Sequence, residues 1–560
     1  MVNLEEIVKK RISRRDFAKY LAKGAISIAI LPSFITSCGK EKVSKSSTYP
    51  YLPGSSYKIG PYFTTLNKTV KPVLPLPEDG NYYPEDHPDL GKYSFGEGEN
   101  IILRDDPPFT RTDNPQRAVL LYFVHLSDIH LTDEESPMRM VDADAKGATQ
   151  GAYRRQSMYS TQVLNSVVRT INHLAKPRKF DFVILTGDLI DNDEYVELRW
   201  LIDIMDGKAV NPDTGKDDDP VPGPANDFND PFQAWGLDKN IPWYAVIGNH
   251  DLGVQGTFFA TEYYNQYAVG DTVYGGSQDG SKPDATKIRS NTKVPSDPKR
   301  HLLGTRVKDY QDASPYISEF FKTSSSPVGH GFRSKDDKVG FYTVDPGKGF
   351  IRIIAMDTYD IKNGGADGYM SRDQWENLVI PAIEQARKDK KLVILTSHHA
   401  SYYMKSNSEV SGEEIVNTLL QYPHVILHLV GHGHLNRIDY HINSEGTNGY
   451  WEIQTSSLID FPQQGRIIEI VYNGDGTDSI FTVMLDHNSP EGCMSYRSRE
   501  LALLEMQIGD ATGCGPGKPE DRNTELIFKV PDEIRQVIES KIDQLEKQTA
   551  AETFLKEEIT

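Results

Sequence analysis

The sequence predicts an α/β fold in which helices cover the outer faces of a sandwich of two β-sheets. Short, almost wholly apolar runs alternate with segments of helical periodicity between residues 118 and 430, a pattern typical of sheets buried on both faces. Each apolar run ends in polar residues of the types used for binding or catalysis. After residue 436, closely spaced strand-like segments separated by turn residues indicate antiparallel pairing.

Five apolar runs are expected to be strands, over residues 118–126, 182–185, 243–247, 392–395 and 425–430. They are rich in Val, Ile, Leu and aromatic residues, and they are too short for typical helices. Ligands collect at the carboxyl ends of strands in doubly covered sheets. We therefore expect one such sheet to bring the five polar ends together.

Helical periodicity predicts helices over residues 155–175, 194–205, 371–389 and 412–421. Four later segments have the pattern of antiparallel strands, over residues 437–443, 449–455, 466–472 and 479–485. Asn473-Gly474-Asp475-Gly476 is a turn signal between the last two segments. These strands predict the second sheet, and a further helix is expected over residues 532–547.

We expect one large domain over residues 111–490, with polar insertions at 131–153, 206–240 and 262–340. Loops of this length inside a domain are usually functional or disordered. Residues 39–110 are expected to form a tether and an N-terminal extension. Residues 491–560 are expected to form a C-terminal extension that contains a helix.

Residues 1–38 have the pattern of an export signal. Arg14 and Arg15 resemble the twin-arginine pair, and the apolar stretch from 24 to 37 is shorter than the roughly 20 residues of a membrane span. The following Ile35-Thr36-Ser37-Cys38 resembles a bacterial lipobox. The alternatives are an uncleaved anchor or an ordinary amphipathic helix. The order of the three features favours an exported protein, periplasmic or envelope-anchored, with membrane contact through a lipidated Cys38.

The polar strand ends form an ordered series of motifs, each of which is weak alone. The series is Asp128-Ile129-His130, Gly187-Asp188, Gly248-Asn249-His250-Asp251, His398-His399 and Gly431-His432-Gly433-His434. This order resembles the calcineurin-like metallophosphoesterase superfamily over about residues 118–487. The resemblance implies a four-layer α/β/β/α sandwich, here with long loop insertions, and hydrolysis of phosphate esters.

The resemblance also implies roles for individual residues. One metal ion would be held by Asp128, His130 and His434, the other by Asn249, His398 and His432, with Asp188 bridging both. His250 would be a catalytic residue facing the phosphate, with the second catalytic residue, Asp251, behind it. His399 is expected to pack or hydrogen-bond. Ala400 departs from the family pattern, in which Pro often stands two places after the ligand histidine.

The chemistry of these side chains agrees with the resemblance. Carboxylate, amide and imidazole ligands suit Mn, Fe or Zn. Two such ions can activate a hydroxide and neutralise charge on a phosphate. His250 has a suitable reference pKa, about 6.5, for donating a proton to the leaving group, and an adjacent carboxylate would raise it.

The net charge of the chain is −19, and about −23 without residues 1–38, so long nucleic acid is not an expected partner. A small phosphate ester can still bind where metal cations reverse the local field. The motifs do not separate a monoesterase from a phosphodiesterase, and a non-catalytic envelope binding protein on the same fold is a further alternative. Cys493 and Cys514 are either a disulfide or two free thiols. The sequence does not predict the oligomeric state.

Overall fold

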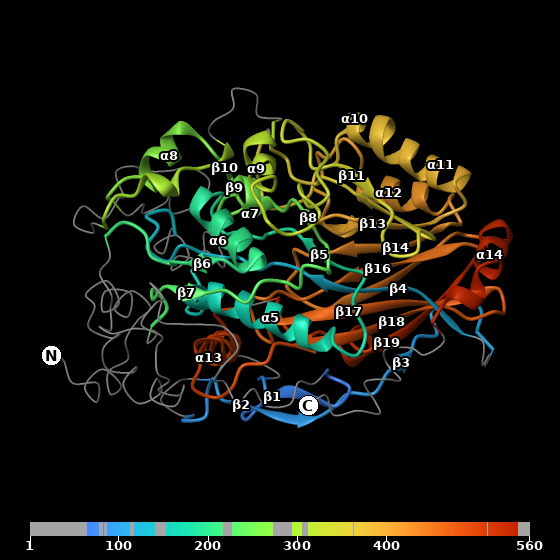
Figure 1. Ribbon diagram of the computed structural model, residues 1–560, viewed down its shortest axis with the longest axis horizontal. Helices are drawn as coiled ribbons and strands as arrows, with labels where there is room; N and C mark the ends of the chain where they lie inside the picture. The colour runs from blue at the N-terminus through green and yellow to red at the C-terminus, as the bar shows by residue number, and fades with distance from the viewer. Residues whose placement is uncertain are drawn as a thin grey trace.

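The structure is a computed structural model (Figure 1). It describes residues 64–77, 82, 87–112, 117–139, 153–216, 227–272, 294–304, 312–361, 363–511 and 513–546. The expected signal, with Arg14, Arg15 and Cys38, lies outside the described residues. Within them, no helix is long and apolar enough to cross a membrane.

The first sheet has seven strands in the order β3-β19-β18-β17-β4-β5-β8. Their bounds are β3 Ile102–Leu103, β19 Thr524–Lys529, β18 Thr477–Asp486, β17 Gln464–Tyr472, β4 Ala118–Leu126, β5 Phe182–Thr186 and β8 Trp243–Val246. The β4, β5 and β8 strands run parallel, and β17 pairs with β4 in the antiparallel direction. Almost every residue of β4, β5 and β8 is buried because both faces of this half of the sheet are covered.

The second sheet has six strands in the order β11-β12-β13-β14-β16-β15. Their bounds are β11 Tyr342–Val344, β12 Ile351–Ala355, β13 Leu392–Thr396, β14 Val425–Val430, β16 Gly449–Gln454 and β15 Arg437–Ile442. The four central strands are parallel, and the two edge strands pair antiparallel. The expected strands are therefore present close to their predicted bounds.

Their distribution between sheets differs from the expectation. The five strands with polar ends do not share one sheet, because β4, β5 and β8 belong to the first sheet and β13 and β14 to the second. The later strands also divide, β15 and β16 joining the second sheet and β17 and β18 the first. The assignment to one parallel and one antiparallel sheet is wrong, since local patterns report strand type and burial but not which distant strand is the hydrogen-bonding partner.

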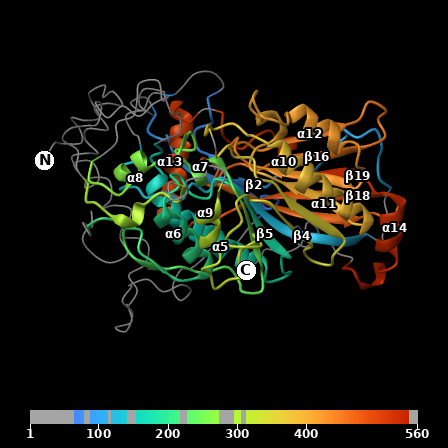
Figure 2. The same cartoon turned by 90° about the horizontal axis from the view of Figure 1, so that it is seen from above.

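Helices cover both outer faces. The first sheet packs against α5 (Ser160–Leu174) and α6 (Tyr195–Asp206), whose apolar residues share a core cluster with β4 and β5. The second sheet packs against α10 (Arg372–Gln374), a π-helical turn (Trp375–Val379), α11 (Ile380–Lys388) and α12 (Gly412–Leu419). Figure 2 looks down onto α10, α11 and α12, which lie over the strands. The four-layer α/β/β/α architecture predicted from the sequence is confirmed.

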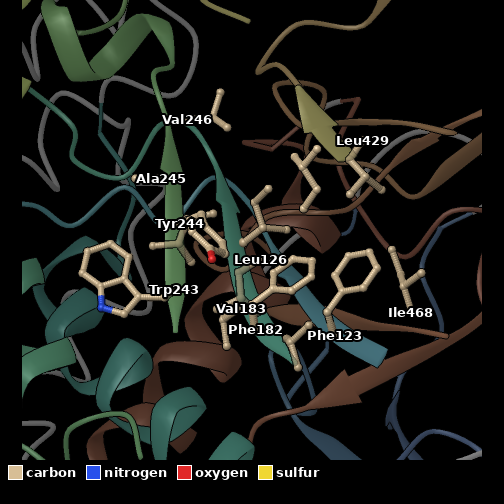
Figure 3. Close-up of a cluster of buried hydrophobic side chains, with 14 of the residues drawn as sticks. Phe123, Leu126, Phe182, Val183, Trp243, Tyr244, Ala245, Val246, Leu429 and Ile468 are labelled. Atoms are coloured by element: carbon tan, nitrogen blue, oxygen red, sulfur yellow. The ribbon is translucent and has the colours of Figure 1, made fainter. Parts of the chain in front are cut away.

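The core between the sheets is made of interlocking apolar side chains. Phe123 of β4 stacks on Phe182 of β5 with ring centroids 4.5 Å apart, and Leu429 and Ile468 pack nearby (Figure 3). Trp451 of the second sheet donates a hydrogen bond of 2.9 Å from its indole nitrogen to the carbonyl of Ile527 in the first sheet. Apolar packing and this hydrogen bond thus hold the two sheets in a fixed relation.

Further elements surround this sandwich. They are β1 (Lys68–Pro72), β2 (Tyr93–Glu97), β6 (Ala209–Val210), β7 (Phe232–Gln233), α7 (Asn249–Leu252), β9 (Gly253–Val254), β10 (Phe258–Phe259), α8 (Glu262–Ala268), α9 (Ser314–Glu319), α13 (Met494–Ile508) and α14 (Asp532–Glu539). The expected terminal helix begins at Asp532 as predicted and ends at Glu539, before a short 3-10 turn. The sequence did not predict β19, which the C-terminal segment adds to the first sheet beside β18.

Candidate metal centre

The polar ends of five strands, three from the first sheet and two from the second, meet in one place. The residues are Asp128 and His130 after β4, Asp188 after β5, Asn249 and His250 after β8, His398 after β13, and His432 and His434 after β14. Potential ligand atoms of Asp128, His130, Asp188 and His434 lie within 4.8 Å of one another. His398 lies 3.1 Å from Asp188, and Asn249 and His432 line the same cavity as His130, Asp188 and His434, so the structure brings together all seven residues predicted as metal ligands.

The backbone at these strand ends is unusual. Asp128, His130, Asp188, His432 and His434 all have positive φ angles, between 45° and 70°. Such conformations cost a non-glycine residue about 1–3 kcal/mol and cluster at functional sites. These turns carry five of the side chains that meet where the two sheets adjoin.

Asp188 lies at the middle of the cluster. Its Oδ2 atom is 3.1 Å from Nε2 of His398 and 3.7 Å from Nε2 of His130. Its Oδ1 atom accepts a hydrogen bond of 2.8 Å from the backbone N–H of His250. This carboxylate stands between histidines assigned to different metal ions, a position that suits a bridging ligand.

His130 and His434 point toward each other, with their Nε2 atoms 3.1 Å apart and that of His434 3.2 Å from Oδ1 of Asp128. Their outer nitrogens bind carboxylates, since Nδ1 of His130 lies 2.8 Å from Asp191 and Nδ1 of His434 contacts Asp460. Histidines that bind metals are commonly oriented by carboxylates in this way. The inner Nε2 atoms are left to face a cation.

The other ligand set contains a buried oxygen atom, Oδ1 of Asn249, that has no hydrogen-bond partner among the described residues, and the buried Nε2 of His398, which faces Oδ2 of Asp188 at 3.1 Å. Nδ1 of His398 must donate to the carbonyl of Thr186, 2.7 Å away, so Nε2 carries a lone pair in the neutral ring. A buried polar atom without a partner costs about 1–3 kcal/mol. A cation bound between these atoms and His432 would satisfy both, so the residues present fit a metal ion.

His399 is occupied elsewhere, although its ring lies near His398 and His432. Its Nδ1 is 2.9 Å from the hydroxyl of Thr358, and its Nε2 is 2.8 Å from the carbonyl of Ala366. Both ring nitrogens are used, and the expected hydrogen-bonding role of His399 is confirmed.

The expected pairing of His250 with Asp251 is wrong. Nδ1 of His250 lies 2.9 Å from the carbonyl oxygen and 3.3 Å from the carboxylate of Asp191. The carboxylate of Asp251 instead accepts hydrogen bonds from the backbone N–H groups of Gly248, Leu189 and Ile190. Neighbouring residues of one helical turn point in different directions, so adjacency in sequence did not produce contact. These hydrogen bonds from Asp251 stabilise the loop that carries Asp188.

The electrostatics favour cations. Burial opposes ionisation of Asp128 and Asp188, yet the nearby histidines hold the pKa of Asp128 at about 2 and that of Asp188 well below its usual value. Burial also opposes charging of His398 and His434, but Asp188 and Asp128 raise their pKa values to about 9. Since a metal ion binds only the neutral imidazole ring, metal binding to His398 and His434 would release protons.

A cavity of about 450 Å³ opens onto the cluster. The residues that line it include His130, Asp188, His250, Arg154 and Cys514. Cys493 and Cys514 are free thiols.

Sequence reasoning missed three residues of this site: Asp191, Asp460 and Arg154. Asp191 follows Asp188 by three positions in the same loop, which was a usable signal. No local pattern marks Asp460 or Arg154, which reach the site through tertiary folding alone.

The fold and the Asp/His cluster together define a metal-dependent phosphoesterase class. The sequence profile of the calcineurin-like phosphoesterase family matches residues 121–436, more than half of the chain, and the chain belongs to this family. A search of curated proteins finds no match.

Two solved structures from Thermus thermophilus are similar at low identity. The protein TT1561 is 11% identical, with a TM-score of 0.22, over 68% of this chain and 96% of its own. A sulfate thiohydrolase, SoxB, in complex with glycerol is 11% identical, with a TM-score of 0.27, over 72% of this chain and 62% of its own. This chain thus spans less than two thirds of SoxB.

Proposed function

We propose that this chain is a dinuclear-metal phosphoesterase that hydrolyses a small phosphate ester outside the cytoplasm. The observation that carries the proposal is the group of ligand atoms from Asp128, His130, Asp188 and His434, which lie within 4.8 Å of one another where the two sheets meet. Oδ1 of Asn249, in the wall of the same cavity, is buried and has no hydrogen-bond partner among the described residues.

Asp128, His130 and His434 would hold one ion, Asn249, His398 and His432 the other, and Asp188 both. This donor set fits Mn, Fe or Zn. When bound, such a pair of ions supplies an activated water nucleophile and neutralises charge on the reacting phosphate.

His250 has the geometry of a proton donor. Its Nδ1 must donate to the carbonyl of Asp191, so Nε2 can donate only when the ring is charged. Although burial opposes the charge, Asp188 and Asp191 raise the pKa of His250. The ring lines the cavity, where Nε2 would give its proton to the oxygen of the leaving group.

The test is hydrolysis by purified protein lacking residues 1–38, stripped of metal and then reloaded with Mn, Fe or Zn. Nitrophenyl phosphate and bis-nitrophenyl phosphate serve as monoester and diester substrates. We expect two ions per chain by elemental analysis and hydrolysis only by the reloaded protein. Two bound ions without hydrolysis of any ester would favour the non-catalytic binding protein, and faster diester hydrolysis would favour a phosphodiesterase.

Export is a separate part of the proposal. It is supported by the order of Arg14 and Arg15, the apolar stretch and Cys38 in the sequence. The mature protein would be periplasmic or held at the envelope by a lipid on Cys38.

A further inference from the structure

Arg154 is a cationic side chain in the wall of the metal cavity. Its side chain is only 12% exposed, and its Nε atom donates a hydrogen bond of 3.1 Å to Oδ1 of Asp460. The other carboxylate oxygen of Asp460 contacts His434. One carboxylate therefore places the guanidinium next to a candidate metal ligand.

The Nη atoms of Arg154 donate no hydrogen bond to any residue that the structure describes. Neither Nη atom is among the buried unpartnered atoms of the described residues, so both are accessible from the cavity. Asp460 has two further partners, because Gln156 donates to the same oxygen at 3.2 Å and His434 contacts the other. Arg154 lines the cavity, where an anion would satisfy these donors.

The position of Arg154 is fixed through the next residue in the chain. The neighbouring Arg155 donates 2.7 Å hydrogen bonds from its backbone N–H to Glu505 and from its side chain to Asp510. These hydrogen bonds hold residues 154 and 155 against the end of α13. A guanidinium held in a fixed position can direct its two Nη donors to one oxygen of a phosphate group.

We infer that Arg154 binds a non-bridging oxygen of the substrate phosphate and makes this site selective for phosphate monoesters. The inference rests on the proposed function. A monoester dianion has three non-bridging oxygens and a diester monoanion has two. If two oxygens are taken by cations, only a monoester has a third, charged oxygen left for the Nη atoms of Arg154.

The experiment compares the metal-loaded wild type with Arg154→Gln and Arg154→Lys, using nitrophenyl phosphate and bis-nitrophenyl phosphate, which share a leaving group. Arg387→Gln is the control, because Arg387 is an exposed arginine of α11, paired with Glu384. We expect Arg154→Gln to lower kcat/KM for the monoester roughly 10- to 100-fold, the range of a hydrogen bond to a charged group. The diester should lose no more than about 3-fold.

Binding of inorganic phosphate, measured by calorimetry on metal-loaded protein, gives a readout independent of turnover. Its Kd should rise with the loss of monoester activity in Arg154→Gln, and metal content should not change. The phosphate Kd of Arg154→Lys should lie between those of the wild type and Arg154→Gln. Lysine keeps the positive charge but lacks the paired N–H donors of the guanidinium.

Three outcomes would each overturn the inference. They are an equal loss of kcat/KM for both esters, an unchanged phosphate affinity, and a loss of metal from both Arg154 variants. These outcomes would make Arg154 a structural partner of Asp460. A wild type that hydrolyses neither ester would instead refute the proposed function, while the phosphate titration would still decide whether Arg154 binds the anion.

Discussion

Asp188 contributes its two carboxylate oxygens to different tasks. Oδ2 faces the histidines of the centre, and Oδ1 holds the backbone of His250. One side chain therefore sets both the charge of the centre and the position of the proposed proton donor.

Asp188→Asn keeps the shape of the side chain and removes one negative charge. We expect lower metal occupancy and a loss of turnover of several orders of magnitude, because the charge between two cations is lost. Elemental analysis and steady-state kinetics measure the two effects. Two tightly bound ions with unchanged turnover would contradict the bridging role.

His250→Ala separates metal binding from catalysis. Both ions should remain bound, while turnover should fall roughly 10²- to 10⁴-fold, the usual range for general acid–base catalysis. The loss should be smaller with nitrophenolate as the leaving group than with an alkoxide, which needs the proton. Equal losses with both leaving groups would indicate electrostatic support alone, and loss of an ion would make His250 a ligand.

The candidate ligands were predictable because each follows a strand directly, so local pattern and motif coincide. Asp191 and Asp460, which orient the histidines, were not predicted. Their effect depends on which side chain they face after folding, as the misassigned Asp251 also shows. Residues that orient metal ligands are in general hard to predict from sequence, because they need not stand at a fixed number of positions from the ligands.

At the scale of elements, the loops after the strands control the site through their backbone. Gly187, between β5 and Asp188, has a φ of +90°. A Cβ atom there would lie 2.6 Å from Nδ1 of His398 and 2.8 Å from the backbone nitrogen of Gly248. The loop after β5 and the side chain after β13 are therefore in direct contact across the two sheets.

Gly187→Ala should both strain the loop and displace His398, which would lower metal affinity and stability. Gly446→Ala is the matched control, because Gly446 has a φ of +66° but a Cβ there meets nothing within 4 Å. Both variants should lose about 1 kcal/mol from backbone strain, and only Gly187→Ala should lose metal. Denaturant unfolding and metal titration distinguish them. Equal metal affinity in the two variants would contradict this account.

Strands made of continuous apolar runs were the most predictable elements, and four helices appeared where expected. The type of helical hydrogen bonding was less predictable than the position of the helices. The expected helix over 371–389 contains a π-helical turn at Trp375–Val379, just before Pro381, which has no backbone N–H to donate. The division of strands between two sheets was not predictable, because it depends on contacts between residues hundreds of positions apart.

At the scale of the molecule, the N-terminal sequence predicts export. Replacing Arg14 and Arg15 by Lys keeps the charge and changes only the feature that the export receptor reads. We expect this variant to remain in the cytoplasm, and Cys38→Ala to be exported without lipid. Cell fractionation and lipid labelling measure both. Normal delivery of the double Lys variant to the envelope would refute twin-arginine export.

Each proposed ion has ligands from both sheets: Asp128 and His130 with His434, and Asn249 with His398 and His432. Separating the sheets would destroy both ion sites, so occupancy and folding are thermodynamically linked. By mass action, free metal at 100 times its Kd would add about 2.7 kcal/mol to the free energy of unfolding for each ion. The Tm should rise with metal concentration and fall with a chelator. In a metal-poor environment the protein would lose resistance to unfolding together with its activity.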